Sequence, residues 1–362
     1  MNKVVQFADW VREIRSRIPG FVAGMSVPSS PGRYKFSLSG DIIPESTHWG
    51  LGQSTFAARI LYIFGLLDDL KRGEISKYIL SFKGKDDYVY DREIESRSRF
   101  PRFVSAVKSL SPRLYLTYTS KFAETRQAYA ALINLGQPIL LPRMLKAFDR
   151  KSIHEFVAGL NWQNPWGAAS QINHLIFFIH FSEYLSADEK KSALDSIEDS
   201  LQGYRRADGS FYRKGDLPDI NLRIGSAMKI FMGLSLVNRA GPWVNKEIYD
   251  LAFKFSGNCN ACELFNANYV LYACSKRMAV DREELASSVL SRIGSLREHY
   301  WPDYGAFSFY PGKAGTVYYS AVVSKGFAEP DMHGTAMLSW SIFILSAMLG
   351  VNQELGLKEP VL

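Results

Sequence analysis

Amphipathic stretches alternate with strongly apolar ones along most of this chain. In the amphipathic stretches, hydrophobic residues recur every three or four positions, which predicts helices with one buried face and one face in water. The apolar stretches carry almost no charge, so each is expected to pack on several sides. The clearest pair joins residues 186–204 to residues 218–237, where Lys229 is the single charge in the segment IGSAMKIFMGLSLV.

The alternation predicts six helix pairs. The amphipathic members are expected at 3–17, 97–110, 139–159, 187–203, 245–255 and 281–298, and the apolar members at 50–67, 120–135, 166–185, 219–237, 259–274 and 331–349. A unit that cannot bury its own apolar face must stack on its neighbours. We therefore predict an all-α fold, an (α/α)6 toroid of six inner and six outer helices with short β-hairpin-like excursions in the loops. An open solenoid is the alternative, but it usually needs polar capping repeats, which the sequence does not contain.

Composition and targeting signals favour one large globular unit. The chain has 362 residues, 47% of them hydrophobic, and no linker-like segment divides it, so residues 1–362 are expected to form a single domain. Three cysteines without framework spacing indicate a reducing compartment, and the charged N-terminus lacks the apolar core of a secretory signal. The expected location is the cytoplasm.

One segment, residues 334–352, carries no charge and is just long enough to cross a bilayer. A buried inner helix predicts the same pattern, and the polar residues scattered through the segment favour that alternative. We expect no stable membrane insertion.

The net charge of +7 is diffuse. The densest basic cluster alternates with two glutamates and comprises Arg92, Arg97, Arg99 and Arg102. It lacks the interleaved aromatic residues of a single-strand nucleic-acid surface, so no nucleic-acid partner is expected. The cluster is either a solvated helix face or an anion-binding patch. In the second case, Arg97, Arg99 or Arg126 would reach the cavity mouth and hold a diphosphate or carboxylate group.

The predicted toroid also indicates where chemistry would occur. Its inner helices run in the same direction, so their N-termini gather at one end, where the helix dipoles favour anions. Polar and aromatic residues near these starts form one candidate site for a small molecule or an oligosaccharide: His48, Trp49, Trp166, His174, Asp219, Asn221, Arg223, Glu263, Asn266, Asp331 and His333.

Within this set, the strongest candidate is the pair Asp331-x-His333 at the start of an uncharged helix. The carboxylate could orient the imidazole, raise its pKa and share proton transfer with it. Alternatively, Asp331 is only the N-cap of its helix, and the same alternative applies to Asp219. Glu263 is the only acid in the fifth apolar helix, where burial would raise its pKa and suit it to act as a general acid.

No bound cofactor is required by these residues. Cys259-x-x-Cys262 with His333 is a weak alternative zinc site, since no second Cys pair completes a structural zinc motif. The acidic run at residues 86–91 is similar to a magnesium-binding segment, but it lies in a connector rich in lysine and tyrosine, which favours a surface loop.

Two turn-and-helix units, Asp208-Gly209-Ser210-Phe211 and Gly305-Ala306-Phe307, resemble repeats of the terpenoid cyclase and protein prenyltransferase superfamily of α/α toroids. The run GAFSFYPGK from Gly305, followed by a helix that opens with His333, is similar to the stretch of prenyltransferase β-subunits that carries a zinc-binding histidine. The resemblance implies acid–base chemistry on an isoprenoid or prenyl-type ligand. The Asp-x-Asp-Asp motif of class II cyclases is absent, because Leu66-Leu67-Asp68-Asp69 has only its second half, and so is the Asp-x-Cys pair.

Two other classes of function stay open. Such folds also occur in carbohydrate-active lyases, hydrolases and epimerases, which would act here on an acidic oligosaccharide with tryptophans as platforms. A non-catalytic toroid that binds a ligand or partner is the third. A closed pocket walled by aromatic residues favours the first class, an open groove the second, and a centre filled by side chains the third.

Overall fold

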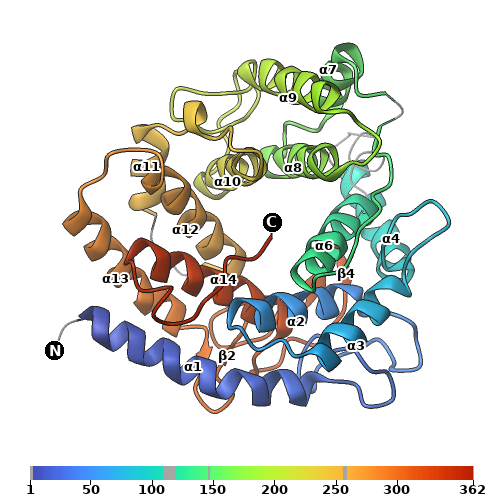
Figure 1. The fold of residues 1–362 in the computed structure, drawn as a ribbon, viewed down its shortest axis with the longest axis vertical. Coiled ribbons are helices and arrows are strands. Elements are labelled where there is room, and N and C mark those ends of the chain that lie inside the picture. Colours follow the sequence, from blue (N-terminus) through green and yellow to red (C-terminus); the bar gives the residue numbers. More distant parts are fainter. Residues whose placement is uncertain (1–2, 109–119, 146, 256–258, 362) are drawn as a thin grey trace.

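The computed structural model describes residues 3–108, 120–145, 147–255 and 259–361 (Figure 1). The chain is mostly helical, with 57% helix, 13 α-helices, one short 3-10 helix and four two-residue strands in the described ranges. The apolar helices are α2 (Leu51–Ile63), α6 (Ser120–Asn134), α8 (Pro165–Phe181), α10 (Ile220–Leu236), α12 (Ala261–Ser275) and α14 (Met332–Met348). We call these six the inner helices.

The remaining helices are the outer helices. They are α1 (Lys3–Met25), α3 (Asp69–Leu80), α4 (Arg92–Lys108), α7 (Arg150–Gly159), α9 (Ala187–Gln202), α11 (Lys246–Phe253) and α13 (Arg282–Arg297), with the 3-10 helix η1 at Gly241–Trp243. The strands form two antiparallel hairpins, β1 (Tyr300–Trp301) with β2 (Ala306–Phe307) and β3 (Val317–Tyr318) with β4 (Ala321–Val322).

The inner helices contact one another in circular order. Helix α2 contacts α6, and the series continues through α8, α10 and α12 to α14, which returns to α2. Figure 1 shows the outer helices on the periphery of this circuit. Burial explains the division: in α14 every side chain except those of His333 and Ala347 is buried, whereas α9 buries only one stripe that includes Leu194, Ile197 and Leu201.

Most predicted helices are found, with ends shifted by a few residues, and two regions differ. Helix α3 was not predicted, because its sequence shows no strong amphipathic period. In the structure it begins after the N-cap Asp68, whose side chain accepts a hydrogen bond from Lys71 N. The half-motif Leu66-Leu67-Asp68-Asp69 is therefore a helix start. The helix expected over 139–159 begins only at Arg150, where Asp149 caps it.

The uncharged segment 334–352 is mainly the body of α14, which is packed against its neighbours α2 and α12. None of the described helices is both long enough and apolar enough to cross a bilayer.

The C-terminal tail, residues 351–361, lies across one end of the inner helices. Lys358 N donates to Ile63 O at 2.9 Å, and Val361 N donates to Asn134 Oδ1 at 2.9 Å. These acceptors stand at the C-terminal ends of α2 and α6. The tail also lines a pocket of about 410 Å³ with the last turns of α8, α10 and α12. The C-terminal ends of these five helices therefore lie on the same side, and Figure 1 shows the chain terminus inside the circuit.

Candidate functional site

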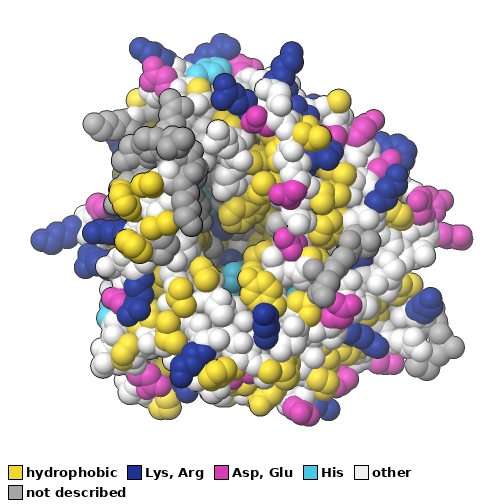
Figure 2. Space-filling view, turned by 180° about the vertical axis from the view of Figure 1, so that it is seen from behind, with side chains coloured by type: hydrophobic (Ala, Val, Ile, Leu, Met, Phe, Trp, Pro, Cys, Tyr) yellow, Lys and Arg dark blue, Asp and Glu magenta, His cyan; other side chains and the backbone are white. Residues whose placement is uncertain are grey.

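A cavity of about 250 Å³ lies toward the N-terminal ends of the inner helices, and each of the six contributes side chains to it. Figure 2 shows this face hollowed near its centre, with hydrophobic side chains around the hollow and histidine within it. We call it the central cavity. Its walls are largely aromatic or apolar and include Phe56, Trp166, Met232, Phe265, Tyr318, Met337 and Trp340.

Three cations from three different helices line the central cavity: Arg59 of α2, Arg126 of α6 and Lys229 of α10. Arg59 and Arg126 are only 4% and 5% exposed. None of the three makes an ion pair or hydrogen bond with a described residue, and none of the described lining residues is Asp or Glu. The Nε atom of Arg126 is buried without an acceptor. The site therefore concentrates positive charge that the described part of the chain does not neutralise.

Aromatic rings partly substitute for the missing carboxylates. The Arg59 guanidinium lies 4.9 Å from the centre of the Trp340 ring, and Lys229 Nζ lies 5.4 Å from that of Trp166. Such contacts contribute roughly 0.5–2 kcal/mol, less than the penalty for burying an unpaired charge. Burial, reinforced by repulsion from Arg126, lowers the pKa of Arg59 to about 10 and that of Lys229 to about 7.

Two histidines, His174 and His333, line the same cavity. The His333 ring stacks on Phe56 at 4.9 Å and on Phe309 at 4.7 Å between ring centres. Burial, followed by repulsion from Arg59 and Lys229, lowers the pKa of His333 to about 3. Burial and the nearby Arg126 lower the pKa of His174 well below its usual value. Both imidazoles are therefore neutral near pH 7, and each is a weaker base than an ordinary histidine. The expectation that a carboxylate raises the pKa of His333 is wrong.

Cys262 lies beside His333, with its Sγ 3.7 Å from the imidazole Nε2. Burial raises the pKa of the Cys262 thiol to about 12. Since the thiol holds its proton and the imidazole is neutral, the two do not form a thiolate–imidazolium pair of the kind that activates a cysteine nucleophile.

Asp331 is completely buried, but it is not among the residues that line the central cavity. Its carboxylate accepts hydrogen bonds from the backbone N–H groups of Phe309 (2.6 Å), Gly315 (3.0 Å) and Gly334 (2.8 Å). The last of these caps α14. No hydrogen bond to the His333 ring is found among the described residues, because the carboxylate is already engaged by backbone from two loops and a helix start. The expected Asp331–His333 side-chain pair is thus replaced by a cap.

The other two acids proposed from the sequence are also caps outside the cavity lining. Glu263 is half-buried and accepts from Asn260 N at 3.0 Å in a capping box. Asp219 is exposed and accepts from the first amides of α10, including Asn221 N at 2.8 Å. Nearby Arg223 pairs with Asp208 at 2.5 Å, away from the cavity. Asp219 and Glu263 therefore lie at helix starts because they cap the helices, and not because they belong to the cavity.

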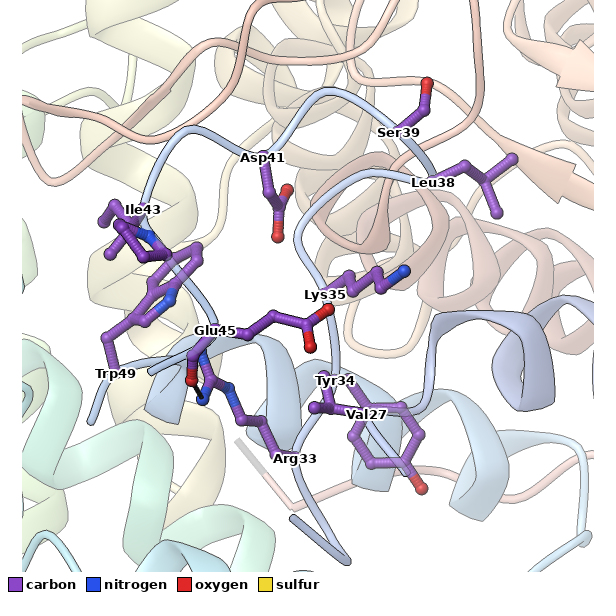
Figure 3. Close-up of a pocket in the computed structure, with 11 residues that line it drawn as sticks. Val27, Arg33, Tyr34, Lys35, Leu38, Ser39, Asp41, Ile43, Glu45 and Trp49 are labelled. Carbon is purple, nitrogen blue, oxygen red and sulfur yellow. Dashed lines mark hydrogen bonds between the residues drawn. The ribbon is translucent and has the colours of Figure 1, made fainter. Parts of the chain in front are cut away.

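The two residues proposed from the segment before α2 lie elsewhere. His48 is exposed and stacks on Phe82, with ring centres 4.2 Å apart. Trp49 is buried and lines a separate pocket of about 240 Å³ (Figure 3). In that pocket Asp41 points inward and the Glu45 side chain extends toward Lys35, and Arg33 donates to the Glu45 carbonyl oxygen at 2.5 Å. The loop thus separates these residues from the central cavity.

The possible metal ligands are Cys262 with His333 and the acidic run at residues 86–91. Cys262 and His333 lie together, but no third ligand joins them: no group of three His, Cys, Asp or Glu suited to a metal occurs in the described ranges. In the acidic run, Asp86 pairs with Lys121, and Asp91 accepts from Gly50 N at 2.7 Å, which fixes the start of α2. The residues present do not fit the zinc site that the resemblance implies.

The fold therefore brings together Trp166, His174, Asn266 and His333 from the predicted set, and Arg126 from the proposed anion-binding residues. By contrast, Arg97 is exposed and pairs with Glu93 at 2.6 Å. Arg59 and Lys229 also line the cavity, although neither was predicted to do so from the sequence. A usable signal existed, because each is an isolated charge within an apolar helix.

Short β-hairpins in the loops were predicted, but the contribution of the β3–β4 hairpin to the cavity lining was not. This hairpin adds Tyr318, Tyr319 and Ser320. Tyr319 and Ser320 adopt positive φ values of 45° and 68°, as the two-residue turn requires. Gln127 Nε2 donates to Tyr319 Oη at 2.6 Å, which fixes this turn against α6.

The sequence matches no protein-family model, and a comparison with curated proteins finds no similar chain.

Proposed function

We propose that the chain is an (α/α)6 toroid enzyme whose central cavity binds a small organic anion with an apolar body, of the prenyl diphosphate kind. The observation that carries this proposal is the set of three cations, Arg59, Arg126 and Lys229, without a described acid to neutralise them. Buried charges are normally paired. An anionic ligand would supply the missing partner, and guanidinium groups match the oxygens of phosphate and carboxylate groups.

The walls of the cavity support an apolar body rather than a bare ion. Phe56, Phe265 and Trp340 place ring faces and edges beside the cations. Aromatic faces bind hydrocarbon and stabilise positive charge that develops on it. A volume of about 250 Å³ lies just below the usual range of about 300–1,000 Å³ for ligand sites, so a short prenyl chain fits better than a long one.

His333 is the proposed base. Its imidazole is a weak base, but a proton on a carbon next to a developing cation is strongly acidic, so a weak base can remove it. The Phe56 and Phe309 rings hold the imidazole in its orientation. Asp331 acts on His333 only indirectly, by fixing the start of α14.

The second candidate is a lyase or epimerase acting on an acidic sugar. The guanidinium groups would also stabilise the negative charge that develops when a proton next to a carboxylate is removed. The small volume of the cavity favours the first candidate, since an oligosaccharide needs a long groove. A toroid that only binds its ligand is the third.

The test is calorimetric titration with dimethylallyl diphosphate, inorganic diphosphate, dimethylallyl alcohol and galacturonate. We expect dimethylallyl diphosphate to bind most tightly and the alcohol not to bind. Arg126→Met should weaken diphosphate binding about 10- to 100-fold, because a charged hydrogen-bond partner is lost. The control Arg97→Met removes an exposed arginine on α4 and should leave the affinity unchanged. Affinity that is insensitive to Arg126, or lost equally in both variants, would refute the proposed site.

Turnover separates an enzyme from a binding protein. Conversion of dimethylallyl diphosphate to isoprene and diphosphate is the reaction to follow: the C–O bond to diphosphate breaks, a methyl group of the resulting cation loses a proton to His333, and a new C=C bond forms. His333→Ala should lower the rate of isoprene formation about 100-fold without weakening binding. Preferential binding of galacturonate would favour the second candidate, and tight binding of a diphosphate without turnover the third.

A further inference from the structure

Lys229 has an unusual position among the lysines of this chain. It lies midway along α10, and its ammonium group reaches the central cavity beside the Trp166 ring. Several other lysines form ion pairs at the surface; Lys246, for example, bonds both carboxylate oxygens of Asp250 at 2.8 and 2.9 Å. Lys229 has no acid partner among the described residues.

Titratable groups face Lys229 from the other five inner helices: Arg59 on α2, Arg126 on α6, His174 on α8, Cys262 on α12 and His333 on α14. None of them is a carboxylate, and two are guanidinium groups. Burial and repulsion from Arg126 lower the pKa of Lys229 to about 7. A substantial fraction of the side chain is therefore a free amine near neutral pH, whereas an ordinary lysine is almost entirely protonated.

A free amine is a poor anion-binding group but a good nucleophile. If Lys229 served only to add positive charge, an arginine would keep that charge at every physiological pH. The two guanidinium groups already supply fixed charge, and they add to the effect of burial, the largest cause of the lowered pKa of Lys229. This arrangement, an amine activated by neighbouring cations inside an apolar site, is a known route to lysine nucleophiles.

We propose that Lys229 forms a covalent imine with the carbonyl carbon of an aldehyde or ketone whose anionic group is held by Arg59 and Arg126. In this step the amine nitrogen adds to the carbonyl carbon, both amine hydrogens pass to the carbonyl oxygen, and water leaves. The step needs no oxidant or reductant. It rests on the proposed anion site and extends that site to oxo acids and phosphorylated aldehydes or ketones.

The probe is pyridoxal 5′-phosphate, which combines an aldehyde, an aromatic ring and a phosphate. The full-length protein is incubated with it at pH 7, the imine is reduced with borohydride, and the modified lysines are located by peptide mass spectrometry. We expect modification first at Lys229, with a rate that rises through pH 7, and at least tenfold faster than at Lys246. The pKa of Lys246 is raised by its bond to Asp250, so it is a matched internal control.

Two further measurements separate this proposal from the anion site on which it rests. Lys229→Arg should abolish the fast modification but still bind inorganic diphosphate, and an excess of inorganic diphosphate should protect Lys229 in the wild type. Diphosphate binding without modification of Lys229 would overturn the imine alone. Fast modification that diphosphate does not block would instead reject the anion site. Modification of surface lysines only, with no diphosphate binding, would reject both.

Discussion

The two ends of the inner helices differ in whether their basic side chains are paired with acids. At the C-terminal end, Lys276 lies 3.6 Å from Glu359 of the tail, and Tyr272 donates to the same carboxylate at 3.1 Å. At the N-terminal end, Arg59, Arg126 and Lys229 share a cavity lined by no described acid. At the C-terminal end, Lys276 is therefore paired with an acid of the tail. At the N-terminal end, the three cavity cations have no acid partner among the described residues.

The difference supports the proposal that a ligand binds at the N-terminal end. Lys276 and Glu359 are about half exposed, at 50% and 53%, so water would solvate them even without their ion pair. Arg59 and Arg126 are buried, and an unpaired buried charge lowers stability. Such a cost persists where function requires it, as with other strained features of binding sites.

The largest expected effect concerns Asp331, which is fully buried at the start of α14. Asp331→Ala would leave the N–H groups of Phe309, Gly315 and Gly334 without their acceptor. At about 1–3 kcal/mol for each buried unsatisfied group, the free energy of unfolding should fall by about 3 kcal/mol or more. Urea unfolding measures it.

The matched control is Asp219→Ala. It removes the N-cap of another inner helix, but this cap is exposed, and the expected loss is about 1 kcal/mol. Equal losses in the two variants would mean that the backbone bonds of Asp331 do not stabilise the loops at this end.

A smaller effect concerns the pH dependence of stability without ligand. The pKa of Lys229 is about 7 in the folded chain and 10.5 when unfolded, so the unfolded state binds more protons between these values. Stability should therefore rise with pH across this window, and the penalty should be complete below pH 7. Between pH 7 and 8.5 the contribution of Lys229 should be about 1–2 kcal/mol.

Lys229→Met should remove this part of the rise, whereas Lys246→Met should follow the wild type over the same interval. Urea unfolding at several pH values provides the measurement. Parallel curves for wild type and Lys229→Met would show that the ligand-free cavity does not suppress the charge of this lysine, and the contrast between the two ends would weaken.

The smallest effect is expected at the C-terminal end. Glu359→Gln removes a half-exposed ion pair with Lys276, and unfolding should change by less than about 1 kcal/mol. Diphosphate affinity measured by calorimetry should not change, since this residue is at the other end of the helices. A marked loss of affinity would show that the two ends are coupled through the tail.

The helices themselves were predictable, because local pattern decides them. Isolated apolar runs such as 331–349 could be assigned to inner helices, since an uncharged helix must be buried whatever its neighbours. Caps such as Ser186 with Glu189 are likewise read from adjacent residues, and the structure contains this capping box. Helix α3 escaped prediction because its Gly73 and evenly scattered charges give no period.

The membership of the site was decided by tertiary structure. Polar residues at helix starts were natural candidates, but Asp219, Glu263 and Asp331 are used to satisfy backbone N–H groups, which local sequence cannot distinguish from chemistry. Arg59, Arg126 and Lys229 come from helices far apart in the chain and meet only when the inner helices pack together. The pKa values of these three side chains are lowered because the packed helices bury them in one cavity. The sequence determined where helices form and which faces are buried, because these depend on neighbouring residues; only packing decided which charges share a cavity, because that depends on residues distant in the chain.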